Sequence, residues 1–339
     1  MLKLDIVLFT LLASLILNFF LKKKGLLLDI KYSQHKLYSS RHAVPLSGGV
    51  VIMVLSLIFL GSFDLISKSI LFFIFLVGFF SDTNLLSSPS KRFIFQAFTV
   101  LLFIYLNNIM VHSLRVEIFD NLLQHKFINY IFLLTCILIL INGTNFIDGL
   151  NTLVIGYFLS VIITVIFANY NSDLDYPDIN LKIYLAILIP LFFLNLFGYL
   201  YLGDSGSYLL SFIVGYILID FSNHSEIISP YFIAVLLWYP AYENLFSIIR
   251  KKLKKISITT ADNKHLHHLL FGYLKFKFKK RELFTNSLTA LIINSYNVII
   301  FIISIQNVSQ TKNLILLIFI SIMIYNSLYY FLIKNDIKN

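Results

Sequence analysis

The stretch ILILINGTNFIDGLNTLVIG, residues 137–156, places a polar segment between two apolar runs. The chain has 339 residues, of which 58% are hydrophobic and only 13% are charged. A soluble globular protein carries about 25% charged residues, and apolar runs long enough to cross a bilayer recur along this chain. The sequence therefore predicts an all-α, polytopic integral membrane protein. The polar segment at 142–151 then needs an explanation of its own.

Hydropathy predicts about eleven transmembrane helices in a single integral membrane domain, residues 1–339. The first run is followed by Lys22–Lys24 and lacks a small-residue cleavage site, so we interpret it as a retained helix rather than a signal peptide. The predicted helices are 4–21, 48–64, 66–80, 93–107, 128–142, 150–168, 181–200, 207–221, 229–248, 284–304 and 313–333.

The distribution of Lys and Arg predicts the orientation of these helices. With the N-terminus outside, the connections on the cytoplasmic side and the C-terminal tail hold 21 of the 27 Lys and Arg residues. This agrees with the positive-inside rule, which the opposite orientation would violate. The net charge of +10 therefore indicates topology and contact with anionic membrane lipids, and it does not indicate a nucleic-acid partner.

Five polar stretches all fall on the predicted cytoplasmic side. The topology was predicted from hydropathy and from Lys and Arg alone, so this gathering is an independent observation. It predicts that the five stretches form one site at the cytoplasmic edge of the membrane. They are HKLYSSRHAVPLSGG (35–49), SDTNLLSSPSKR (81–92), NGTNFIDGLN (142–151), GDSGS (203–207) and ADNKHLHH (261–268).

Three carboxylates in these stretches lie at predicted helix ends: Asp82, Asp148 and Asp204. An Asp near the membrane centre costs about 2.5–3.5 kcal/mol and less at the boundary, so a carboxylate kept there usually meets a cation. Carboxylates with a neighbouring amide such as Asn145 are hard oxygen ligands, which suit Mg²⁺. Taken singly, each Asp could instead be a helix cap or a turn residue.

Three histidines, His265, His267 and His268, lie in one basic loop. Zinc is one interpretation, but no Cys lies nearby in the sequence. With Lys264 and Arg250 close in sequence, an anion-binding site for a diphosphate fits better, and a solvated loop without a role is the alternative.

Taken together and in this order, the five stretches resemble the polyprenyl-phosphate N-acetylhexosamine-1-phosphate transferases, glycosyltransferase family 4. The resemblance extends from about His35 to His268. The residues that match the family's motifs are His35, Pro45–Gly49, Asp82 followed by Lys91 and Arg92, Asn145 with Asp148 and Gly149, Gly203 with Asp204, Glu243 with Arg250, and His265 with His267 and His268.

This resemblance implies an Mg²⁺-dependent enzyme of the inner membrane, with its active site cytoplasmic. The implied reaction takes a UDP-N-acetylhexosamine and undecaprenyl phosphate to undecaprenyl-diphosphate-sugar and UMP, which initiates a cell-envelope polysaccharide such as lipopolysaccharide. It further implies that Asn145 and Asp204 hold the metal, that Asp82 acts on the lipid phosphate and that Asp148 helps to shape the nucleotide site. The residues implied in substrate binding are His35, Lys91, Arg92, Arg250, His265, His267 and His268.

Two positions depart from the family's pattern. Ser81 replaces the first Asp of the usual Asp-Asp pair, and Asn151 stands where many members have another Asp. Both changes remove negative charge from the predicted site. We therefore expect Asp82 alone to act on the lipid phosphate.

Several alternatives stay open at this point. Within the family, the phospho-MurNAc-pentapeptide transferase usually has three consecutive His, whereas this chain has His-x-His-His. A membrane transporter would place its polar residues nearer the midplane, often in repeated halves. An intramembrane protease would use Ser205 of the GDSG stretch with a His. The donor sugar is open between GlcNAc, the default, and GalNAc, QuiNAc or FucNAc, and a homodimer is compatible with the sequence.

Overall fold

The computed structural model describes residues 3–28, 43–59, 64–257, 264–278 and 281–336. Within these ranges the regular elements are thirteen helices, and no strand is present beyond an isolated bridge between Leu28 and Pro45. The helices are α1 Leu4–Lys24, α2 Gly48–Phe59, α3 Leu65–Asp82, α4 Pro89–Leu106, α5 Glu117–Leu123, α6 Lys126–Ile147, α7 Leu153–Asn171, α8 Ile179–Leu196, α9 Gly203–His224, α10 Pro230–Leu253, α11 Leu266–Phe278, α12 Glu282–Ile305 and α13 Thr311–Asp336.

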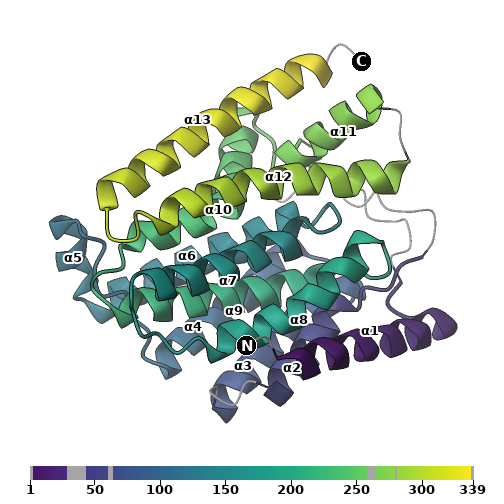
Figure 1. Cartoon of the computed structure of the whole chain (residues 1–339), viewed down its shortest axis with the longest axis horizontal. Coiled ribbons are helices and arrows are strands. Elements are labelled where there is room, and N and C mark those ends of the chain that lie inside the picture. The colour runs from purple at the N-terminus through teal and green to yellow at the C-terminus, as the bar shows by residue number, and fades with distance from the viewer. Residues whose placement is uncertain (1–2, 29–42, 60–63, 258–263, 279–280, 337–339) are drawn as a thin grey trace.

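Nine of the described helices are long and apolar enough to cross a membrane: α1, α3, α6 to α10, α12 and α13. The shorter apolar α2 and the 18-residue α4 account for the other two predicted helices. The prediction of an all-α polytopic membrane protein is confirmed. Two further helices, α5 and α11, were not predicted, and Figure 1 shows them at opposite ends of the molecule.

Several helix ends differ from the predicted ones. The predicted helix 207–221 begins four residues earlier, at Gly203, and the predicted helix 128–142 continues to Ile147. Hydropathy assigns polar residues to loops, because an apolar environment penalises unpaired polar groups. Here the polar residues at these ends bond to neighbouring helices, so the helices continue through them.

Helix α9 is the centre of the bundle. It packs against α2, α3 and α6. The most apolar part of α9 is 78% buried, whereas the corresponding parts of α1 and α13 are each 22% buried. Figure 1 shows α1 and α13 at opposite edges of the bundle. Large apolar side chains such as Leu12, Phe19 and Phe319 are exposed there. Such side chains suit lipid contact, because hydrocarbon does not penalise exposed apolar surface as water does.

The start of α9 requires a glycine. Gly203 has φ +74°, a conformation that L side chains rarely adopt. A Cβ at this position would also lie 2.7 Å from Asp82 Oδ2. Backbone conformation and close approach therefore both exclude a side chain at the point where α9 begins beside the end of α3.

We expect Gly203→Ala to lower the stability of the protein by about 2 kcal/mol, because it adds the left-handed backbone penalty to a steric clash. The matched control is Gly272→Ala in α11, where a Cβ meets no atom within 4 Å. That control should be neutral or stabilising, because alanine favours a helix more than glycine does. Thermal unfolding of both variants in detergent measures the difference, and equal melting temperatures would contradict this account.

Candidate active site

The carboxylate of Asp82, the last residue of α3, binds the first turn of α9. Its Oδ1 accepts a hydrogen bond from the Asp204 backbone N–H at 2.8 Å. Its Oδ2 accepts from the Ser205 backbone N–H at 3.0 Å and from Ser205 Oγ at 2.7 Å. The first N–H groups of a helix lack partners within the helix and carry a partial positive charge. Asp82 therefore caps α9 from another helix and fixes where α9 begins.

The Asp204 side chain lies at the centre of a second set of contacts. Its Oδ2 pairs with Arg92 Nη1 at 2.9 Å and accepts from Ser81 Oγ at 2.6 Å. Its Oδ1 accepts from Asn145 Nδ2 at 2.8 Å. Four helix ends, those of α3, α4, α6 and α9, thus meet at one carboxylate. The structure brings together Asp82, Arg92, Asn145 and Asp204, which come from three separate stretches of the sequence.

Ser81 explains how this arrangement works without the Asp-Asp pair. Its hydroxyl donates to Asp204 and accepts from Arg92 Nη1 at 2.6 Å. An Asp at this position would place a second negative charge beside Asp204, and like charges disfavour each other's ionised form. The serine keeps the hydrogen bond to Asp204 and omits that charge.

Residues 146–149 connect this cluster to the histidines. The Phe146 ring lies 5.2 Å from the His265 ring, and Lys251 Nζ lies 6.0 Å from the centroid of Phe146. A Cβ at Gly149 would lie 2.8 Å from His268 Cε1 and 2.9 Å from His267 Nε2. The polar segment that interrupts the apolar sequence is therefore the contact point between the Asp204 cluster and α11.

The backbone that follows Asp148 is held by three asparagines. Asn286 Oδ1 accepts from the Asn151 N–H at 2.6 Å, and Asn294 Nδ2 donates to the Thr152 carbonyl at 3.0 Å. Asn195 Oδ1 accepts from the Thr152 N–H. Thr152 has φ +66°, a strained conformation for a β-branched residue. These bonds to α8 and α12 hold that strain in place.

Asp148 and Asn151 line a small cavity in this region. Its volume is about 20 Å³, which is room for about one water molecule. Asn151 is buried and its Nδ2 has no hydrogen-bond partner within the described part of the chain. Asp148, predicted to shape a nucleotide site, is thus a wall of a polar cavity beside the histidine contacts.

The oxygen donors present fit a hard cation better than a soft one. Asp204 and Asn145 are in direct contact, and Asp204 is only partly buried. Among the described residues, no group of three or more His, Cys, Asp or Glu has the geometry of a metal cage. Mg²⁺ needs no such cage, because it is commonly bound by one or two carboxylates together with substrate phosphates and water. Asp204 and Asn145 therefore fit Mg²⁺.

The other predicted site residues lie in different surroundings. His35 lies outside the described residues. Lys91 is exposed, and it is Arg92 that reaches Asp204. Arg250 is buried, and its guanidinium donates to the Lys264 carbonyl and to Tyr329. Through its bond to the Lys264 carbonyl, Arg250 holds the backbone just before His265 in place.

The protease interpretation of the GDSG stretch does not fit the contacts. Ser205 is fully buried, and its hydroxyl donates to the Asp82 carboxylate. The stretch forms the first turn of a buried helix, so Ser205 has the environment of a helix-cap residue rather than that of an accessible nucleophile.

Residues 65–222 match the family model described as Glycosyl transferase family 4. This part of the chain therefore resembles glycosyl transferase family 4. It contains Asp82, Arg92, Asn145, Asp148 and Asp204, and it ends before the histidines of α11. No curated protein sequence matches the chain. This match supports, in general terms, a membrane transferase that moves a sugar phosphate onto a polyprenyl phosphate.

Sequence reasoning did not single out two residues of this region. Tyr208 is buried beside Asp204 and Arg92, and Ser207 Oγ lies 3.4 Å from Asn145 Nδ2. Their spacing gave a partial signal, because Asp204, Ser207 and Tyr208 lie on one face of a helix at positions i, i+3 and i+4. The signal was lost because the helix was predicted to begin at residue 207.

Asp82→Asn tests the cap described above. The amide can accept fewer of the three hydrogen bonds and would place an N–H donor against the N–H groups of α9. We expect a loss of about 2–3 kcal/mol in stability, because hydrogen bonds to charged groups are worth about 1.5–3 kcal/mol each. Thermal unfolding in detergent measures it.

The matched control is Asp64→Asn, which changes the exposed carboxylate that accepts from the Ser67 N–H at the start of α3. This variant should unfold close to the wild-type temperature. If both variants lost the same stability, or neither lost any, Asp82 would not have the capping role assigned to it.

Proposed function

We propose that the protein transfers an N-acetylhexosamine-1-phosphate from a UDP-sugar to undecaprenyl phosphate and releases UMP. The reaction takes place at the cytoplasmic face of the inner membrane, with the N-terminus outside. The product initiates a cell-envelope polysaccharide, and GlcNAc is the first donor to test. The observation that carries the proposal is the meeting of Asp204, Asn145 and Arg92 at one end of the helix bundle, in a chain whose residues 65–222 match glycosyl transferase family 4.

The arrangement of charges supports this chemistry. Both substrates are anionic phosphates, so their approach must be offset by positive charge. Arg92 contacts Asp204, while Lys251 and His265 lie against Phe146, the residue after Asn145. A lipid phosphate at the membrane edge can thus meet Arg92, while a nucleotide diphosphate from the cytosol meets the histidines. Residues 145–149 lie between the two groups.

Asp204 and Asn145 would hold Mg²⁺. When bound, the ion would supply charge neutralisation for the diphosphate and for the departing UMP. Arg92 would then exchange part of its contact with Asp204 for a phosphate oxygen, because a guanidinium binds phosphates and carboxylates with the same geometry. Asp82 keeps α9, and therefore Asp204, in position. Its predicted action on the lipid phosphate stays a prediction.

The proposal is tested with purified protein in detergent, undecaprenyl phosphate, Mg²⁺ and a panel of UDP-N-acetyl-sugars that includes UDP-MurNAc-pentapeptide. UMP release and sugar in the lipid extract are measured together, with and without a chelator. We expect turnover with one N-acetylhexosamine donor and loss of turnover in the chelator.

Other outcomes would change the conclusion. Turnover with UDP-MurNAc-pentapeptide alone would assign the protein to peptidoglycan synthesis. Absence of turnover with every donor, from protein that unfolds cooperatively on heating, would contradict the transferase proposal.

A further inference from the structure

Glu243 of α10 is a fully buried carboxylate, 0% exposed. A buried carboxylate is costly unless it is paired and hydrogen-bonded. Its Oε1 lies 2.9 Å from His265 Nδ1 and 3.4 Å from the Leu266 N–H. Its Oε2 accepts from the Tyr325 hydroxyl at 2.8 Å. One carboxylate oxygen thus contacts the start of α11, and the other bonds to α13.

The contact with Glu243 fixes the orientation of the His265 ring. When Glu243 is ionised it can only accept hydrogen bonds, and the nitrogen that faces it, Nδ1, is then the donor. The other ring nitrogen, Nε2, then points away from Glu243, and the contact fixes the direction in which the ring points. The Phe146 ring packs on the imidazole at 5.2 Å. His265 is therefore oriented by a carboxylate from one side and by the polar segment of α6 from the other.

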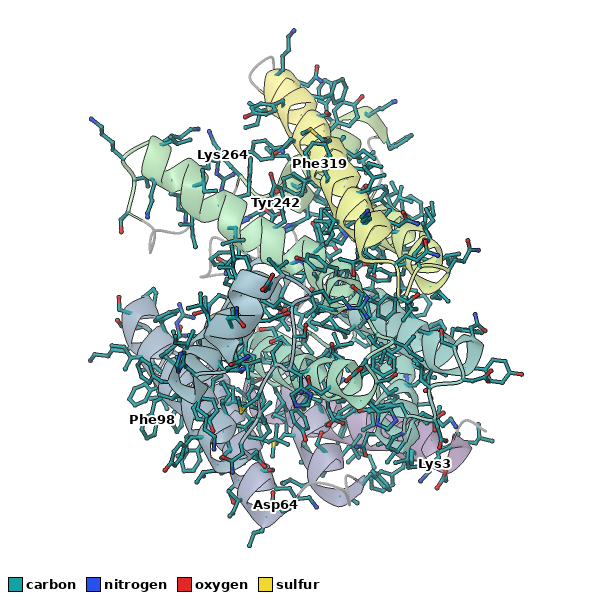
Figure 2. The ribbon with its side chains drawn as sticks, turned by 90° about the vertical axis from the view of Figure 1, so that its left-hand side faces the viewer. Lys3, Asp64, Phe98, Tyr242, Lys264 and Phe319 are labelled. Atoms are coloured by element: carbon teal, nitrogen blue, oxygen red, sulfur yellow. The ribbon has the colours of Figure 1, made fainter. Side chains whose placement is uncertain are left out.

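A second set of contacts holds the same piece of chain. Arg250 donates to the Lys264 carbonyl, and Arg250 Nη1 lies 2.7 Å from the Tyr329 hydroxyl. Tyr325 and Tyr329 are one turn apart on α13, with their rings stacked at 6.2 Å. Figure 2 shows Tyr242 of α10 and Lys264 in the region between α10 and α13. The C-terminal helix thus contributes two hydroxyls that secure the residues leading into α11.

We propose that Glu243 and Tyr325 are positioning residues that orient His265 to bind the diphosphate of the sugar-nucleotide donor. The proposal rests on the transferase function proposed above and extends it to α13, which lies outside the matched family segment. It gives the C-terminal helix a role in donor binding, in addition to its lipid-facing surface.

The test compares Tyr325→Phe with Tyr242→Phe. The Tyr242 hydroxyl bonds to Asn326 Oδ1 at 3.0 Å and so links the same two helices, α10 and α13, through Asn326 rather than through Glu243. Each variant loses one hydroxyl and keeps its ring. We expect Tyr325→Phe to raise the KM for the UDP-sugar about three- to tenfold, since a hydrogen bond to a charged group is lost. The KM for undecaprenyl phosphate should not change.

Tyr242→Phe should leave both KM values at the wild-type level, although it can lower the melting temperature equally. Glu243→Gln is the stronger variant. If it folds, we expect its kcat/KM for the donor to fall more than that of Tyr325→Phe, and Glu243→Asp should recover part of the loss.

Two results would overturn the proposal while the transferase function stands. One is an active wild type in which Tyr325→Phe and Tyr242→Phe have the same kinetics. The other is a Tyr325→Phe variant in which both KM values rise together, as expected of a loosened fold. An inactive wild type would instead overturn the proposed function, and this inference with it.

Discussion

The rest of the structure depends on the carboxylate of Asp82 at the start of α9. Three hydrogen bonds from Asp204 and Ser205 end on this one side chain. They fix the first turn of the most buried helix against the end of α3. Because Asp204 lies in that turn, its position relative to Ser81, Arg92 and Asn145 follows from the cap. Burying the unpaired N–H groups at a helix N-terminus costs free energy. Here Asp82 pairs with two of them and thereby holds the first turn of α9 in place.

The positions of the charged side chains follow from the contact between Asp82 and the first turn of α9. Asp82 is balanced by the N–H groups of α9, whereas Asp204 is balanced by Arg92 and remains partly accessible. The two carboxylates, one on α3 and the other on α9, thus have different environments. Ser81 makes this division possible, because its hydroxyl bridges Arg92 and Asp204 without adding a charge. The histidines of α11 form a separate group, joined to the first by Phe146 and Gly149.

Much of this arrangement could be predicted from the sequence. Apolar runs gave the helices, because a bilayer requires about 20 apolar residues for each span. The polar residues at the helix ends predicted which side chains would gather, and the structure brings Arg92 and Asn145 to Asp204. The order of the motifs gave the resemblance to the family, which the match to residues 65–222 confirms.

The partners of individual side chains could not be predicted. Hydropathy cannot show that Asp82 caps a helix far away in sequence, so α9 was predicted to begin at residue 207 instead of Gly203. Helix α11 was missed because its Lys residues and histidines resemble a basic loop. The role of Tyr325 was hidden for a different reason. A tyrosine in an apolar helix is ordinary, and only the contact with Glu243 distinguishes it.

The central claim is that chemistry takes place at Asp204. UMP release by Asp204→Asn, compared with the wild type under the same conditions, tests it most directly, because the amide keeps the shape of the side chain and removes its charge. The account predicts a fall in kcat of about 100-fold or more, since charge stabilisation at the reacting phosphates is lost, with cooperative thermal unfolding retained. An Asp204→Asn variant with wild-type kcat would contradict it.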